Sequence, residues 1–176
     1  MHFIDSEASL EKAKCLIGME LIGVDAEWRP GMTTFQQSKP ALFQVGGLEQ
    51  VCLFDMVALA NNKALDELLE KAFTQAGSVV IGFSFHNDLK AFAKSFPEMR
   101  FYRRFACLID LQQLFSEMYA AEKSMGLSKV TDYVIGKPIC KGEQMSNWER
   151  RPLRSSQTHY AALDAYIMAF LYRKMD

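Results

Sequence analysis

The feature that most constrains the fold is the alternation of short apolar segments with segments of helical periodicity. The apolar segments are rich in β-branched and aromatic residues, which is typical of strands, and the others carry apolar residues at spacings of three and four. We expect strands at 20–28, 78–83 and 105–110, and two strands within 41–56 joined at Gly46-Gly47. We expect helices at 6–18, 62–73, 88–96, 111–120, 126–136 and 156–174, and a loop at 137–153. This order predicts an α/β fold with a mixed, mostly parallel sheet, an antiparallel hairpin at one edge and helices on its faces.

Length and composition restrict the class of protein. The 176 residues, 49% hydrophobic and 23% charged, fit one globular domain over residues 1–176, which we expect to be part of a longer protein. Proteins that bind duplex nucleic acid over a long footprint are usually more basic than this net charge of −1, so a nucleic-acid partner would be held locally or with help from flanking regions. Four scattered cysteines without a C-x-x-C pair argue against structural zinc and favour reduced thiols, so we expect a cytoplasmic or nuclear protein. We also expect a monomer. The apolar runs are too short for a membrane span, so no membrane partner is expected.

Three acidic residues lie within or shortly after predicted apolar strands, where burial disfavours a charged side chain. Asp25 and Glu27 are alternate residues of an apolar strand and therefore share a face. Charges so close repel unless a cation screens them, although a solvated strand end would also explain the pair. Asp88 follows the strand at 78–83 and begins a helix, where it is either a third site carboxylate or a complement to the helix dipole.

The last helix carries Tyr160 and Asp164 four positions apart, hence on one face. Taken alone, that spacing is typical of an ordinary solvated face. Together with Asp25, Glu27 and Asp88, Asp164 completes a set of four carboxylates without a thiolate, and such a set suits a hard cation such as Mg²⁺ or Mn²⁺. A pair of such ions can assist phosphoryl displacement, and a tyrosine beside them could orient or deprotonate the attacking water.

Three segments resemble the motifs of a known family. "GVDAEW", "GFSFHNDLKAF" and "YAALDAY" are similar to the three motifs of the DEDD 3′-5′ exonucleases of the ribonuclease H-like fold, in the tyrosine (DEDDy) subclass. The region 126–166 is similar to the ribonuclease D and Werner-type branch through Ser146, Trp148, Arg151-Pro152-Leu153, Gln157 and Tyr160-Ala161-Ala162. "EQMSNWERRPL" resembles the exonuclease domain of Nibbler and its relatives, which trim the 3′ ends of small RNAs.

The resemblance implies a two-metal-ion 3′-5′ exoribonuclease acting on single-stranded RNA 3′ ends, with small RNAs such as microRNAs or piRNAs as substrates. It implies two divalent ions, Mg²⁺ or Mn²⁺, with Asp25, Glu27 and Asp164 on the ion that activates water. Asp25 would bridge to the second ion, Asp88 would reach it through water, and Tyr160 would position the nucleophile. Two alternatives stay open: a 3′-5′ exodeoxyribonuclease acting on DNA, and a non-catalytic nucleic-acid-binding module. An Argonaute-family protein is the expected partner, contacted through flanking regions.

Other polar residues are weaker candidates. We expect contacts to the substrate from His86, Arg104, Lys141, Arg150 and Arg154. The alternative for the histidine is a structural or merely exposed side chain, and the alternative for the four basic residues is solvated loop charge. Trp28 and Trp148 are expected to pack rather than to stack on bases. Arg154 departs from the family pattern, which places Thr or Ser there, so Ser155 is the expected cap of the last helix.

Overall fold

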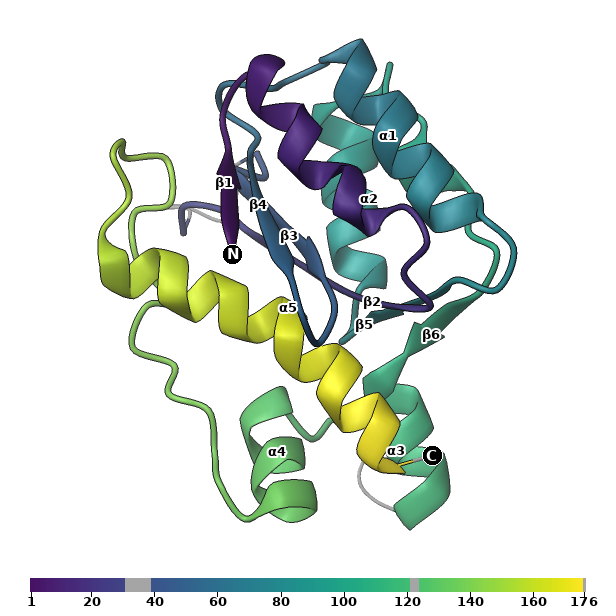
Figure 1. Cartoon of the computed structure of the whole chain (residues 1–176). Coiled ribbons are helices and arrows are strands. Elements are labelled where there is room, and N and C mark those ends of the chain that lie inside the picture. Colours follow the sequence, from purple (N-terminus) through teal and green to yellow (C-terminus); the bar gives the residue numbers. More distant parts are fainter. Residues whose placement is uncertain (31–38, 121–123, 176) are drawn as a thin grey trace.

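The computed structural model describes residues 1–30, 39–120 and 124–175 and contains one six-stranded sheet in the order β1-β4-β3-β2-β5-β6 (Figure 1). The strands are β1 (His2–Ile4), β2 (Leu21–Glu27), β3 (Leu42–Gly46), β4 (Val51–Asp55), β5 (Val79–Gly82) and β6 (Leu108–Asp110). β3 runs antiparallel to both of its neighbours, and the remaining pairs are parallel. The predicted mixed, mostly parallel α/β sheet with a hairpin is confirmed.

Two details of the prediction were wrong. The hairpin of β3 and β4 is not at an edge, because β1 pairs in parallel with β4 outside it. A three-residue strand is too short to show an alternating pattern, which is why the sequence did not reveal it. The sequence "SEASLEKAKCLIG" also predicts a serine cap at the start of the first helix, but η1 (Ala8–Leu16) is a 3₁₀-helix without a side-chain cap. The Ser9 hydroxyl instead accepts hydrogen bonds from the backbone N–H groups of Asp5 and Ser6.

Helices cover both faces of the sheet. On one face η1, α1 (Lys63–Thr74), α2 (His86–Ser95) and the short η2 (Phe101–Arg103) enclose an aromatic-rich core. On the other face lie α3 (Leu111–Tyr119), α4 (Leu127–Ile135) and the long α5 (Ser155–Met175), which crosses the sheet diagonally in Figure 1. None of the helices among the described residues is long and apolar enough to span a bilayer.

The ends of the helices follow local rules. The Asn62 side chain accepts a hydrogen bond from the Leu65 N–H at the start of α1, and Asp110 does the same for Gln112 in α3. Gly136, at φ 71°, ends α4 in the left-handed conformation that glycine adopts without strain. α5 begins at Ser155, and the Gln157 side chain, rather than a serine, accepts from the Arg154 N–H that precedes the helix.

The predicted loop at 137–153 forms neither helix nor strand and is anchored to the sheet. The Arg151 guanidinium donates to both carboxylate oxygens of the buried Asp55, at 2.6 Å each, and to the backbone oxygens of Ala41 and Trp148. Trp148 is fully buried against α5, as expected of a packing residue. This anchor holds the loop over the carboxyl end of β2.

Candidate active site

The site begins with the two faces of β2. Ile22, Val24 and Ala26 pack into the core beneath η1, α1 and α2. By strand alternation, Asp25 and Glu27 therefore point to the opposite face, which α5 covers. Glu27 is buried and Asp25 is partly buried, so neither carboxylate is an ordinary solvated strand end.

Helix α5 supplies the second part of the site. Tyr160 and Asp164 lie one turn apart on its face toward β2, and Asp164 is 3% exposed. The helix comes this close because β2 has a glycine beneath it: a Cβ on Gly23 would lie 1.9 Å from the Ala165 carbonyl oxygen. Because Gly23 has no side chain, α5 packs close to β2, and Asp164, which precedes Ala165, comes close to the two acids on β2.

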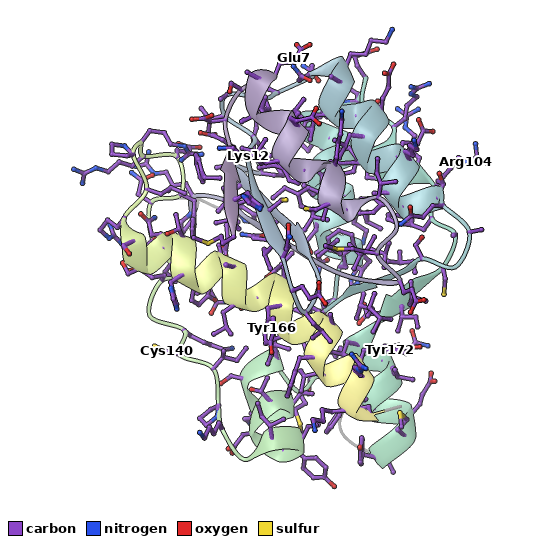
Figure 2. All side chains as sticks on the ribbon, in the orientation of Figure 1. Glu7, Lys12, Arg104, Cys140, Tyr166 and Tyr172 are labelled. Carbon is purple, nitrogen blue, oxygen red and sulfur yellow. The ribbon has the colours of Figure 1, made fainter. Side chains whose placement is uncertain are left out.

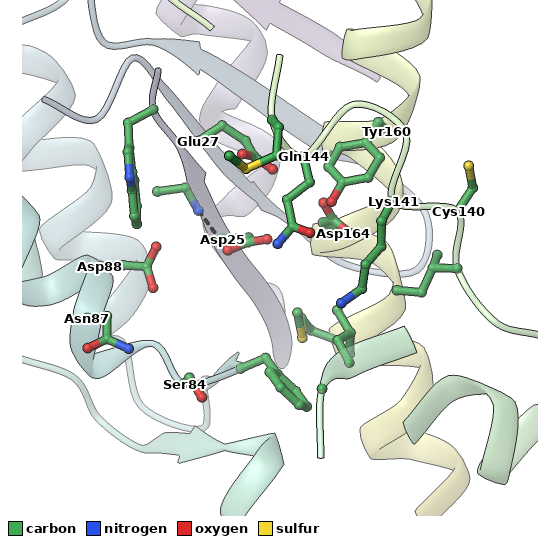
Figure 3. Close-up of a pocket in the computed structure, with 18 of the residues that line it drawn as sticks. Asp25, Glu27, Ser84, Asn87, Asp88, Cys140, Lys141, Gln144, Tyr160 and Asp164 are labelled. Carbon is green, nitrogen blue, oxygen red and sulfur yellow. Dashed lines mark hydrogen bonds between the residues drawn. The ribbon is translucent and has the colours of Figure 1, made fainter. Parts of the chain in front are cut away.

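The carboxylates converge in space. Asp25, Glu27 and Asp164 each place a carboxylate oxygen within 4.8 Å of the others. Asp88, in the first turn of α2 after β5, is 6% exposed and borders the same cavity (Figure 3). The structure thus brings together all four predicted carboxylates and Tyr160 at the carboxyl ends of β2 and β5.

The electrostatics of the cluster disfavour four bare charges. Burial raises the pKa of Asp25 to about 7, although the Ala26 N–H, which donates to its Oδ1 at 2.9 Å, acts in the opposite direction. Burial and the charge of Asp25 raise the pKa of Glu27 to about 10, of Asp88 to about 9 and of Asp164 to about 8. Without a cation, the folded protein therefore holds protons on this cluster near neutral pH.

These residues fit a divalent cation. The cluster offers only carboxylate oxygens, the donors that Mg²⁺ and Mn²⁺ prefer. The Oδ2 atom of Asp164 is buried and has no hydrogen-bond partner among the described residues. A buried carboxylate oxygen normally accepts a hydrogen bond or binds a metal, so this atom is placed as a ligand would be.

Tyr160 is placed as a donor rather than as a base. Burial, followed by the charges of Asp164, Glu27 and Asp25, raises the pKa of its hydroxyl above the ordinary value. The hydroxyl also hydrogen-bonds the Asp164 side chain, which lowers the pKa of that acid. A protonated hydroxyl at this position can orient Asp164 and a nearby polar group but does not remove a proton.

The cavity that holds the acids has a volume of about 610 Å³. Its walls combine apolar side chains from several elements with a few polar groups, which is typical of ligand sites. The apolar lining comes from Trp28, Pro30, Phe83, Leu127, Ile139, Met145 and Met168. Ser84, Asn87, Lys141 and Gln144 add polar side chains (Figure 3). Trp28 also packs partly against the core, so it combines the expected packing role with a place in the cavity wall.

The five residues expected to contact substrate have different positions. Lys141 lines the cavity, and its charge lowers the pKa of Asp164. Arg150 on the anchored loop and Arg154 directly after it are exposed and lie outside the lining, and Arg154 pairs with Glu143. His86 is exposed on α2 outside the lining, where Asn87 takes the place next to Asp88.

Arg104 lies away from the cavity. It precedes the amino end of β6, whereas the acids stand at the carboxyl ends of the parallel strands. Figure 2 shows it on the opposite side of the molecule from Cys140, which borders the cavity. The basic residues near it have structural contacts, since Arg100 pairs with Asp66 and Glu70. The structure does not bring Arg104 to the site.

The sequence did not reveal several lining residues. Ser84 and Gln144 come from separate loops, and no local pattern links them to the acids. Gln44 does not line the cavity but pairs across the sheet with Asp25, and it is the one polar residue within the apolar run "ALFQV". A polar side chain in such a strand was a usable signal.

Comparison with known proteins identifies the family. A family model described as 3′-5′ exonuclease matches residues 1–176. The chain is 31% identical over 173 residues to the exonuclease mut-7 of Caenorhabditis elegans, covering 88% of this chain and 19% of that protein. It is 27% identical over 173 residues to the human exonuclease mut-7 homolog, covering 89% of this chain and 20% of that protein. The chain therefore spans about a fifth of the length of these relatives.

Solved structures share the fold. The Nibbler EXO domain of Aedes aegypti superposes with a TM-score of 0.86 at 24% identity, covering 99% of this chain and 86% of that one. RNase D of Escherichia coli, an exoribonuclease involved in structured RNA processing, gives 0.77 at 22% identity, covering 99% and 44%. RNase D of Trypanosoma brucei in complex with RNA U12 gives 0.82 at 20% identity, covering 99% and 61%.

Proposed function

The chain belongs to the 3′-5′ exonuclease family, and from that premise we propose that it is a two-metal-ion exoribonuclease of the DEDDy subclass. It would remove nucleotides one at a time from the 3′ end of single-stranded RNA. The observation that carries this proposal is the convergence of Asp25, Glu27 and Asp164 within 4.8 Å, with Asp88 and Tyr160 on the same cavity.

The residues of the site would have separate roles in binding the cations, positioning water and contacting the substrate. Asp25, Glu27 and Asp164 would hold one cation, and Asp25 with Asp88 would hold the other. Bound Mg²⁺ or Mn²⁺ would supply Lewis-acid stabilisation and a nucleophile at neutral pH. The Tyr160 hydroxyl would donate to the attacking water and keep it in line with the scissile phosphate. Lys141, which reaches the cavity from the anchored loop, would contact a phosphate of the incoming strand.

The cavity suits a single strand end better than a duplex. Its apolar walls at Trp28, Phe83 and Met145 offer surfaces on which unpaired bases can rest. The net charge of −1 is lower than is usual for proteins that bind a double helix over a long footprint. RNA is favoured over DNA because the loop at 143–153 resembles Nibbler-type relatives, and small RNAs are the proposed substrates on the same ground. DNA is the second candidate.

The surrounding protein, the delivery partner and the cellular compartment are also proposed. Because the chain covers about a fifth of its mut-7 relatives, we infer that residues 1–176 act as one domain of a longer protein. Flanking regions would then contact a delivery partner, for which an Argonaute-family protein is the candidate. A monomer is proposed. The four scattered cysteines, which form no disulfide among the described residues, agree with a reducing compartment, for which the cytoplasm is proposed and the nucleus is the alternative.

A degradation time course tests the proposal. Matched single-stranded RNA and DNA would be labelled at the 5′ or the 3′ end and incubated with Mn²⁺, Mg²⁺ or EDTA. We expect the 5′-labelled RNA to give a ladder that shortens from the 3′ end, and the 3′-labelled RNA to release its label at once as a mononucleotide. EDTA and Asp25→Asn should abolish both. The control variant is Asp132→Asn, which alters an exposed carboxylate on α4.

The possible results distinguish the proposed function from its alternatives. Faster loss of DNA than RNA would replace the substrate by DNA and keep the mechanism. Activity that persists in EDTA or in Asp25→Asn would contradict the metal-dependent mechanism. Binding of both strands without cleavage under any metal would support the non-catalytic module.

A further inference from the structure

A buried glutamine stands beside the acidic cluster without a hydrogen bond. Gln44 is 0% exposed, and both its Nε2 and its Oε1 lack a partner among the described residues. Within that part of the chain, the other buried side-chain nitrogen and oxygen atoms without partners are Asp164 Oδ2 and Trp148 Nε1. Asp164 belongs to α5, Trp148 packs with Ala161 and Ala165 of α5, and Gln44 belongs to β3, so all three residues lie near the layer between the sheet and α5.

The strand register places Gln44 next to Asp25. The two residues are direct cross-strand partners in the antiparallel pair of β2 and β3. Opposite residues of such a pair point to the same face, with Cβ atoms roughly 5 Å apart. On its other side Gln44 is paired with Leu53, which packs with Ala161 and Ala165 of α5. The glutamine side chain therefore lies beneath α5, within reach of the Asp25 carboxylate.

Gln44 is not where packing alone would place a polar residue. Its cross-strand neighbour Leu53 and the adjacent Leu42 on the same face are fully buried and apolar. A methionine or leucine would fill the same volume without burying an unpaired amide, which is unfavourable for folding. Residues that lower stability in this way are concentrated at functional sites.

We propose that Gln44 is a positioning residue for the cation site, an inference that rests on the proposed function. In the cation-loaded protein its Nε2–H group donates to Asp25, the carboxylate assigned to both ions. That hydrogen bond fixes which carboxylate oxygens face the cations, and it gives the amide nitrogen of Gln44 a partner that it otherwise lacks. Hydrogen bonds to metal-binding carboxylates orient the ligands, and their removal weakens metal binding or activity by about 10- to 100-fold.

The test compares metal affinity with metal-free stability in Gln44→Met. Mn²⁺ binding would be measured by calorimetric titration, and the melting temperature would be measured in EDTA. We expect the Mn²⁺ dissociation constant to rise about 10- to 100-fold, while the melting temperature in EDTA stays the same or rises. Gln44→Leu is the second variant, in case methionine packs poorly. Gln50→Met, at an exposed position in the turn between β3 and β4, is the matched control and should bind Mn²⁺ like the wild type.

The outcomes separate this inference from the proposed function. A lower melting temperature in EDTA with unchanged Mn²⁺ affinity in both Gln44 variants would mean that the glutamine is only structural, and would overturn the inference. A wild-type protein that binds no Mn²⁺ would instead overturn the cation site itself. As a spectroscopic readout, titration with Mg²⁺ should shift the side-chain amide resonances of Gln44 in the wild type, and unshifted resonances at saturation would also contradict the assignment.

Discussion

Neutralising Asp25 should stabilise the metal-free protein and abolish its stabilisation by metal. Asp25→Asn keeps the shape of the side chain and the Oδ1 acceptor for the Ala26 N–H, but it removes the charge. Burial raises the pKa of Asp25 from 3.8 to about 7 in the folded protein. A raised carboxyl pKa means that the folded state binds the proton more tightly than the unfolded state. The associated stability is complete below about pH 4 and is lost as the pH rises through about 7.

The size of the effect follows from the same pKa. A tenfold change in proton affinity corresponds to about 1.4 kcal/mol, so full realisation of the Asp25 shift would amount to about 4 kcal/mol. Water and counterions in the open cavity reduce this value, and we expect about 1–3 kcal/mol at pH 8 in EDTA. For a protein of this length that is a melting temperature roughly 3–10 °C higher in Asp25→Asn than in the wild type.

Metal should remove or reverse this difference between the variant and the wild type. A cation at 100 times its dissociation constant stabilises the wild type by about 2.7 kcal/mol, whereas Asp25→Asn should gain little. The assay is thermal unfolding at pH 5 and pH 8, in EDTA and in Mn²⁺, with Asp132→Asn as the control. The difference in EDTA should shrink at pH 5, where the wild-type carboxyl is protonated. An Asp25→Asn protein that is less stable than the wild type in EDTA at pH 8 would refute the reasoning.

Three further changes test the parts of the site. Tyr160→Phe should lower the cleavage rate in single-turnover kinetics by about 10²-fold, while the Mn²⁺ affinity measured by titration stays near that of the wild type. An equal loss of rate and affinity would mean that the hydroxyl only supports the metal ligands. Gly23→Ala should lower the free energy of unfolding by about 1–3 kcal/mol in urea and slow cleavage, because its Cβ would meet the Ala165 oxygen; unchanged stability would show that α5 can move away freely. Arg151→Met should cost about 3–5 kcal/mol in the same titration by leaving Asp55 buried without its ion pair, and a loss under about 1 kcal/mol would mean that the loop has another anchor.

Much of the fold and of the acidic site could be predicted because the signals are local. Asp25 and Glu27 share a face by strand alternation, and Tyr160 and Asp164 share one by helical spacing. The order of strands and helices predicts that the carboxyl ends of β2 and β5 meet, which brings Asp88 to the same edge. Gly46-Gly47 marked the hairpin, and Gly136 marked the end of α4.

The features that escaped prediction depend on long-range contacts. β1 is defined by its pairing with β4, and its three residues carry no periodic signal of their own. The expected substrate contact of Arg104 was wrong although a signal was available, because a residue that precedes a parallel strand lies at its amino end, away from the edge that carries the acids. The role of Arg151 as an anchor depends on Asp55, which is 96 residues away in the chain.

The most direct test of the metal-centred account is anomalous diffraction from a crystal of the protein soaked in Mn²⁺ with a non-hydrolysable single-stranded RNA. We predict two Mn²⁺ peaks in the cavity, one held by Asp25, Glu27 and Asp164 and one beside Asp25 and Asp88, with the 3′-terminal phosphate between them. Strong peaks elsewhere, or an RNA end bound in the cavity without Mn²⁺ near these carboxylates, would contradict the account.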